Sequence, residues 1–142
     1  MLKKMLENNI QVINEAKSWE DAINIAAKPL LEGGNIKEEY INSMVENVVK
    51  NGPYIVIMPG VAIPHARPEC GVINTGISLL KLKNSIKFPK DKDVELLIVL
   101  AANDNDMHLE IISKLTDILM DDDIFENIMK SNDREEIVRC LS

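Results

Sequence analysis

The sequence predicts an α/β fold, in which a mixed β-sheet lies between helices on both of its faces. Helical and strand-like patterns alternate along the chain, and Asp93–Ala101 is apolar at nearly every position after its start. A strand without a polar face must be covered on both sides, as happens between two helix layers. With 142 residues the chain has the length of one domain with its own core, and we expect that domain to span residues 1–142.

The first part of the chain predicts one strand and one helix. Ile10–Ile13 alternates between apolar and polar residues, as short strands do. Ser18 is followed by two acidic residues within one turn, which is typical of a helix start, and Gly33–Gly34 is a typical end. Pro29 lies inside this helical pattern and should kink the helix or shorten its end, because proline has no N–H group to donate.

A second helix, two short strands and a loop are expected next. Asn35 should cap the helix, which ends at the Asn-Gly-Pro of residues 51–53. Residues 54–58 and 61–63 are rich in β-branched side chains and indicate strands on either side of a Pro-Gly turn. The prolines and the glycine of residues 64–71 indicate a loop.

Two longer strands follow in the second half of the chain. Residues 76–82 and 93–101 carry the β-rich patterns, and the second of them is the buried strand described above. The turn at residues 59–60 and the hairpin-like spacing of residues 64–77 predict that some of the strands pair antiparallel.

Three helices are expected at the C-terminal end of the chain. Residues 103–106 are polar and offer several N-caps for a helix with apolar side chains on one face. Two shorter helices should begin at about Asp122 and at Asp133. We interpret the acidic run at residues 121–123 as a helix end and a helix cap, and not as a metal site.

The composition argues against several functional classes. Sixteen Lys and Arg residues against 23 Asp and Glu residues give a net charge of −7, whereas nucleic acids and anionic membranes attract clustered positive charge. The longest apolar run, Leu96–Ala102, is far shorter than the about 20 residues of a membrane helix. The first residues lack the apolar stretch of a secretory signal. We therefore expect a cytoplasmic protein in which Cys70 and Cys140 are free thiols.

The two histidines of the sequence are the first candidates for chemistry. His65 directly follows a predicted strand, and His108 lies in the first turn of the helix that follows strand 93–101. At helical spacing, His108 shares a face with Ile112 and Leu115, so we expect it to face the sheet. Ligands of open α/β sheets bind at the carboxyl ends of strands, and helix N-termini there attract anions. The two rings could therefore meet around a phosphate.

Other interpretations of these residues stay open. Either histidine could be a hydrogen-bonded core residue, and a metal site would need a third ligand from Glu69, Cys70, Asp104 or Asp106. No usual zinc-ligand spacing occurs in the sequence. Arg67, two residues beyond His65, is either a solvated loop charge or a guanidinium that binds phosphate.

The segment Gly52–Glu69, with Pro64-His65-Ala66-Arg67-Pro68-Glu69 at its end, resembles the active-site segment of enzyme IIA components of the bacterial sugar phosphotransferase system. The resemblance is to the mannitol/fructose-type class, most closely to its ascorbate-specific branch, and it extends from Trp19 to His108. The known fold of that class is a mixed sheet flanked by helices, which agrees with the fold predicted above.

The resemblance implies a phosphotransferase with a phosphohistidine intermediate and no cofactor or metal. His65 would accept a phosphoryl group from the phosphocarrier HPr and pass it to a cysteine of the IIB component, which serves the membrane permease IIC in ascorbate-type sugar uptake. His108 would correspond to the second histidine of the family and donate to the transferring phosphate. We expect an apolar docking patch of Met58, Val61 and Ile63 beside His65, with acidic residues at its rim.

One departure from the family leaves the phosphate's cationic partner open. Mannitol- and fructose-type members usually carry an arginine on the helix before the active strand, but residues 42–51 contain none. Arg67 would take its place, or neutral donors would. Two rival functions also remain: a IIA-like regulatory phosphoprotein that acts on a partner in trans, and a metal-dependent hydrolase that uses His65 and His108. The sequence leaves the sugar and the oligomeric state open, and a homo-oligomer is one of the states that it allows.

Overall fold

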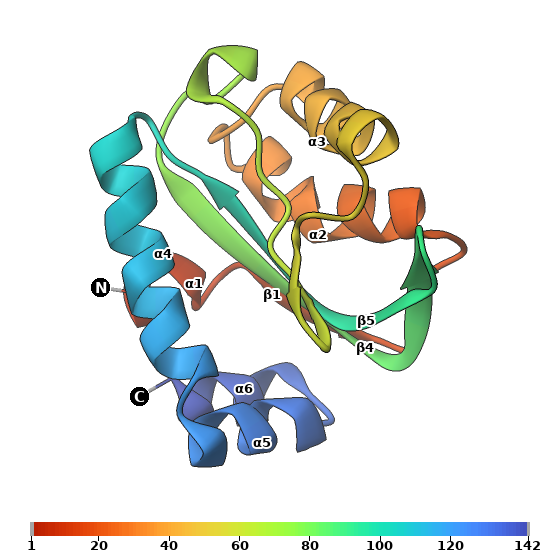
Figure 1. Cartoon of the computed structure of the whole chain (residues 1–142). Coiled ribbons are helices and arrows are strands. Elements are labelled where there is room, and N and C mark those ends of the chain that lie inside the picture. The colour runs from red at the N-terminus through yellow and green to blue at the C-terminus, as the bar shows by residue number, and fades with distance from the viewer. Residues whose placement is uncertain (1, 142) are drawn as a thin grey trace.

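A five-stranded mixed sheet forms the centre of the computed structural model, which describes residues 2–141 (Figure 1). The strands are, in spatial order, β1 (Ile10–Ile13), β4 (Gly76–Phe88), β5 (Lys92–Ala101), β3 (Gly60–Ala62) and β2 (Val56–Met58). The α-helices among the described residues are α1 (Leu2–Leu6), α2 (Trp19–Glu32), α3 (Glu38–Asn51), α4 (Asn105–Leu119), α5 (Asp122–Lys130) and α6 (Arg134–Cys140).

Both parallel and antiparallel pairs occur in the sheet, as the predicted mixed fold requires. β4 pairs antiparallel with β5, while the pairs β1–β4 and β3–β5 are parallel. The turn at residues 59–60 joins β2 and β3 in an antiparallel pair, which confirms that part of the prediction. The hairpin predicted around residues 64–77 is wrong, because β5 lies between β3 and β4 and pairs with both.

Helices cover both faces of the sheet, and this confirms the predicted class. Figure 1 shows α2 and α3 on one face and α4, α5 and α6 on the other. Tyr40 and Met44 of α3 belong to the core on the first face, and Ile111 and Leu115 of α4 belong to the core on the second. The region Leu96–Ala102 is buried throughout between the two layers. None of the helices formed by residues 2–141 is long and apolar enough to cross a membrane.

The helix α2 begins at the predicted residue but continues through its proline. Ser18 is the N-cap and accepts a hydrogen bond from the Asp21 N–H at 3.0 Å. The helix runs past Pro29 to Glu32, so the predicted shortening is wrong. The Ile25 carbonyl, which a residue 29 with an N–H group would bind, accepts instead from Gln11 Nε2 at 2.7 Å.

Two other expectations about the first half of the chain need correction. Lys37, not Asn35, is the N-cap of α3, and no side chain caps that helix. The Asn35 amide instead donates to the Thr75 carbonyl at 3.3 Å, so it ties the helix connection to the start of β4. The strand predicted at residues 54–58 is reduced to β2, because Tyr54 and Ile55 form a turn.

The C-terminal helices begin where the acidic residues predict. Asp104, Asp121 and Asp133 are the N-caps of α4, α5 and α6, and each carboxylate accepts a backbone N–H three residues on. The run at residues 121–123 is therefore a helix end and cap, as expected. Helix α1 was not predicted, since five residues are too few to show a helical period.

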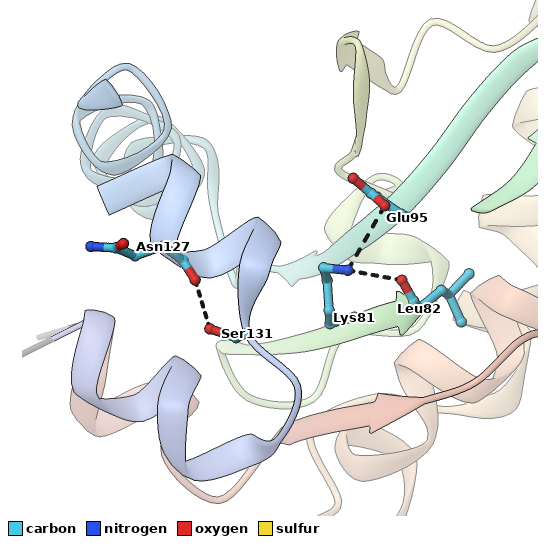
Figure 2. Close-up of polar contacts among 5 residues, drawn as sticks. All are labelled: Lys81, Leu82, Glu95, Asn127 and Ser131. Atoms are coloured by element: carbon cyan, nitrogen blue, oxygen red, sulfur yellow. Dashed lines mark hydrogen bonds and ion pairs between the residues drawn. The ribbon is translucent and has the colours of Figure 1, made fainter. Parts of the chain in front are cut away.

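A buried lysine marks an irregularity in the pairing of β4 with β5. Lys81 is 3% exposed, and its Nζ donates to the Leu82 carbonyl at 2.9 Å and lies 3.8 Å from Glu95 Oε2 (Figure 2). The register shifts beyond Lys81, where extra residues of β4 bulge from the ladder. At the end of α5 in the same view, Ser131 Oγ donates to the Asn127 carbonyl at 2.7 Å.

We predict that Lys81→Met destabilises the fold by about 1–3 kcal/mol, because the Leu82 carbonyl loses its ammonium donor in a buried place. Equilibrium urea unfolding would measure this loss. Lys87→Met is the matched control, since it removes a lysine on the same strand whose ion pair with Asp93 is exposed on both sides. It should change stability little. Equal stability of the Lys81→Met and unaltered proteins would contradict the prediction.

Candidate active site

His65 lies just beyond the carboxyl end of β3, in the loop that the prolines predict. Its Nδ1 is 2.8 Å from the Ile63 carbonyl, which can only accept a hydrogen bond. Nδ1 therefore carries the ring proton, and Nε2 keeps a free lone pair. The side chain is half-buried, so one of its nitrogens is fixed by the backbone while the ring still borders solvent.

The hydroxyl of Tyr40 holds the chain on the far side of His65. Tyr40 Oη accepts from the Ala66 N–H at 3.0 Å and donates to the Leu100 carbonyl at 2.7 Å, while the Leu100 N–H donates to the Pro64 carbonyl at 3.0 Å. Tyr40 is fully buried, and burial raises its pKa to about 12. The phenol therefore keeps its proton, and its role as donor, at neutral pH. Sequence reasoning did not single out Tyr40.

His108 is brought beside His65 by the first turn of α4. Its ring centroid lies 5.2 Å from that of His65. Asp104, which accepts from the Met107 N–H at 2.8 Å, fixes the start of the helix. The pKa of His108 is lowered, mainly because burial disfavours the charged ring and in part because His65 is close. His108 is therefore neutral at pH 7, with one ring nitrogen that donates and one that accepts.

A cavity of about 570 Å³ opens over the two rings. Three parts of the chain supply its polar side chains, at the carboxyl ends of β3 and β5 as the topology predicts. They are Asn47 and Asn51 of α3, His65 and Arg67 of the loop after β3, and Asn105 and His108 of α4. The amides of asparagine, the guanidinium and the neutral imidazole can all donate hydrogen bonds to a phosphate.

Arg67 borders the cavity from an exposed position. Among residues 2–141 no ion pair of Arg67 occurs, so its guanidinium is not committed to a carboxylate of these residues. Cys70 also lines the cavity, and both cysteines are free thiols as expected. Within the same described range, no three His, Cys, Asp or Glu side chains are placed to hold a metal ion. The hydrolase interpretation therefore lacks the third ligand that it needs.

The structure adds site residues that the sequence did not indicate. The ring of Tyr54 meets that of His65 edge-on, with centroids 5.9 Å apart and an interplanar angle of 88°. Asn47 and Asn51 reach the cavity from successive turns of α3, and their spacing of four residues was a signal that could have paired them. Tyr54 lies within the segment that resembles the family's active-site segment, but no chemical role was predicted for it, and a turn conformation brings it to the site.

The predicted docking patch is wrong for Val61 and Ile63, whereas its third residue, Met58, is half-buried. Val61 is fully buried and Ile63 is 3% exposed, because both pack into the core under α4. The exposed apolar side chains next to the two histidines are instead Tyr54, at 47% exposure, and Leu109, at 65%. Helices cover both faces of β3, so its side chains are buried on either side, whereas Tyr54 in the turn before β2 and Leu109 on the outer face of α4 project outward.

Comparisons with known proteins agree with this geometry. Residues 4–142 match the family model of the phosphoenolpyruvate-dependent sugar phosphotransferase system, EIIA 2. The ascorbate-specific PTS system EIIA component of Escherichia coli (strain K12) is 33% identical over 136 residues, which are 94% of this chain and 88% of that protein.

Two solved structures from Escherichia coli have the same fold. The mannitol-specific cryptic phosphotransferase enzyme IIA is 38% identical, with a TM-score of 0.93 over 99% of this chain and 97% of that one. Enzyme IIAMtl, solved in complex with phosphorylated enzyme IIBMtl, is 26% identical, with a TM-score of 0.81 over 94% and 93% of the two chains. The chain therefore belongs to the EIIA 2 family of the phosphoenolpyruvate-dependent sugar phosphotransferase system, whose members are phosphotransferase components.

Proposed function

We propose that this chain carries a phosphoryl group on Nε2 of His65, between the phosphocarrier HPr and a cysteine of a IIB component. The observation that carries the proposal is the ring of His65, fixed through Nδ1 at 2.8 Å from the Ile63 carbonyl, at the edge of an open cavity beside His108. A nucleophile needs a free lone pair and access for two partners in turn, and His65 combines both. The protein would act in the cytoplasm.

In both transfers one bond to phosphorus forms as another breaks. In the first, the Nε2 lone pair forms a P–N bond while the bond from phosphorus to the donor histidine breaks and leaves its electron pair there. In the second, a thiolate of IIB forms a P–S bond and the pair of the breaking P–Nε2 bond returns to His65. Nδ1 keeps its proton throughout, because the Ile63 carbonyl holds it. A relative solved with phosphorylated IIB supports this choice of receiver.

Neutral donors surround the place that the phosphoryl group would occupy. His108 is neutral because burial lowers its pKa, and Asn47 and Asn51 offer amide groups from α3. Arg67 is the one cationic side chain among the described residues that line the cavity. We propose that His108 is the principal donor to the transferring group and that Arg67 supplies charge from the rim.

We predict that one phosphate per chain, acid-labile and base-stable, appears after incubation with enzyme I, HPr and phosphoenolpyruvate. His65→Ala should abolish this labelling, because among the described residues that line the cavity His65 is the nucleophile whose tautomer a backbone carbonyl fixes. Intact-mass spectrometry at high pH would count the phosphates. Cys70→Ser serves as the control within the same cavity and should label normally. Undiminished labelling of His65→Ala would end the proposal.

His108→Ala should leave His65 able to accept phosphate but slow its transfer to IIB by about 10²- to 10³-fold, the usual effect of losing one such donor. Rapid-quench measurement of single-turnover transfer would show this. His108→Gln should recover part of the rate, because its amide can still donate. Since the pKa of His108 is lowered, the contribution of His108 to the rate should change only as pH falls below the ordinary histidine range, where His108 gains its proton. Transfer by His108→Ala at the original rate would assign this ring to the core.

Arg67→Ala in the same assay separates its two interpretations. Slower transfer, restored in part by Arg67→Lys, supports a phosphate-binding charge at the rim. A rate equal to that of the unaltered protein shows a solvated loop residue.

The sugar is the finer question, and we propose ascorbate-type uptake on the resemblance of residues 52–69. The 38% identity to a mannitol-specific cryptic enzyme IIA favours a mannitol-type system as the second candidate. Enzyme IIA meets IIB and not the sugar, so its partner choice is the measurable property. We predict that the phosphorylated chain transfers at least about tenfold faster to an ascorbate-type IIB than to a mannitol-type IIB. The reverse order would select the second candidate, and transfer to neither would favour the regulatory function.

A further inference from the structure

Tyr40 is inserted into the hydrogen-bond ladder between two strands at the position of His65. Val61 pairs with Leu96 and Ala62 with Leu97 in the parallel pair of β3 and β5. The same one-for-one register, continued beyond the strand, places His65 opposite Leu100. In a regular parallel ladder, Leu100 would then bind the residues on either side of His65 directly.

Only one of these two bonds is direct. The Leu100 N–H donates to the Pro64 carbonyl at 3.0 Å, as the ladder requires. The Leu100 carbonyl, however, accepts from Tyr40 Oη at 2.7 Å. The Ala66 N–H donates to Tyr40 Oη at 3.0 Å and not to the Leu100 carbonyl. The hydroxyl therefore stands where a single backbone hydrogen bond would join the two strands, and it separates them by one oxygen atom.

We infer that Tyr40 is a positioning residue, whose inserted hydroxyl turns His65 away from the sheet and holds it at its working distance from His108. The inference rests on the proposed function of His65. The two rings follow neighbouring strands that pair with each other. His65 follows β3, and β5 leads through Ala102 into α4, which carries His108. A wedge between Leu100 and Ala66 thus sets the separation of the two imidazoles, whose centroids lie 5.2 Å apart.

The rest of the loop is anchored to the same end of α3. The Lys37 N–H donates to the Gly71 carbonyl at 2.8 Å. Gly71 has a φ of +136°, and a Cβ there would lie 3.0 Å from the Tyr40 nitrogen, so the loop packs directly on the first turn of the helix. Residues 66–71 are therefore held at both ends by α3, while Pro64 is held by β5. The Tyr40 hydroxyl is the contact that joins these two supports.

The hydroxyl and not the ring is the group that the inference concerns. The aromatic ring is fully buried in the core under α2 and α3, and phenylalanine would fill the same volume. Loss of the oxygen leaves the Ala66 N–H and the Leu100 carbonyl to find each other or to stay unpaired. Either outcome moves the backbone of His65, by closing the ladder or by loosening it.

The test is Tyr40→Phe in the full chain, with Ser78→Ala as the matched control. Ser78 is also fully buried, and its Oγ donates to the Ala26 carbonyl at 2.6 Å, on the same face of the sheet but away from the cavity. Each variant loses one buried hydroxyl, so both should unfold at somewhat lower temperature. Rapid-quench transfer to IIB and the nuclear Overhauser effect between the rings of His65 and His108 are measured for both.

We expect Tyr40→Phe to lower the maximal rate of transfer by about 10- to 100-fold with little change in the IIB concentration at half-maximal rate, because the misplacement affects the reacting atoms and not docking. The ring-to-ring Overhauser effect should weaken. Ser78→Ala should keep both at the original values. Equal rates and Overhauser effects in the two variants would overturn the positioning role. Failure of the proposed function is seen separately, as labelling that survives in His65→Ala.

Discussion

The geometry of the site depends on the parallel pairing of β3 with β5, which continues past the end of β3 to His65. β5 is buried on both faces, so the Leu100 peptide that meets this segment has a fixed position. Its N–H holds Pro64 directly, and its carbonyl holds Ala66 through Tyr40. Hydrogen bonds to the buried strand β5 therefore fix the position of His65, although His65 itself lies in a loop.

The same strand also places the second histidine. β5 ends at Ala101, and the chain then turns at the Asp104 cap into α4, whose first turn carries His108. His65 is hydrogen-bonded to β5 through its neighbours, and His108 follows β5 by a short connection, so the distance between the two rings depends on the sheet. The helices contribute in another way: α3 supplies the amides of Asn47 and Asn51, and its first turn supports the loop after His65.

Sequence reasoning located His65 and His108 because strand ends and helix caps have strong local signals, such as Pro64 and Asp104. It failed where a tertiary contact decided the outcome. The helix passes Pro29 because Gln11 of the preceding strand β1, outside the helix itself, binds the orphaned Ile25 carbonyl. The role of the Tyr40 hydroxyl could not be predicted for the same reason, since its hydrogen-bond partners lie 26 and 60 residues away along the chain. Local patterns cannot show that a helix residue also enters the hydrogen-bond ladder between two strands.

On the proposed function, a mostly neutral cavity suits a carrier that must release its phosphoryl group. Tight binding of the phosphorylated state would lower the free energy of that intermediate and slow the second transfer. Donors whose hydrogen bonds strengthen in the transition state speed both transfers. Neutral His108 and the asparagine amides offer hydrogen bonds without a fixed opposite charge, and Arg67 adds its charge from an exposed position where water screens it. On the proposed function, the absence of an arginine from residues 42–51 is then compatible with rapid exchange. The fixed spacing of the two imidazoles, and not a strongly bound cationic side chain, would then hold the phosphoryl group in line for transfer.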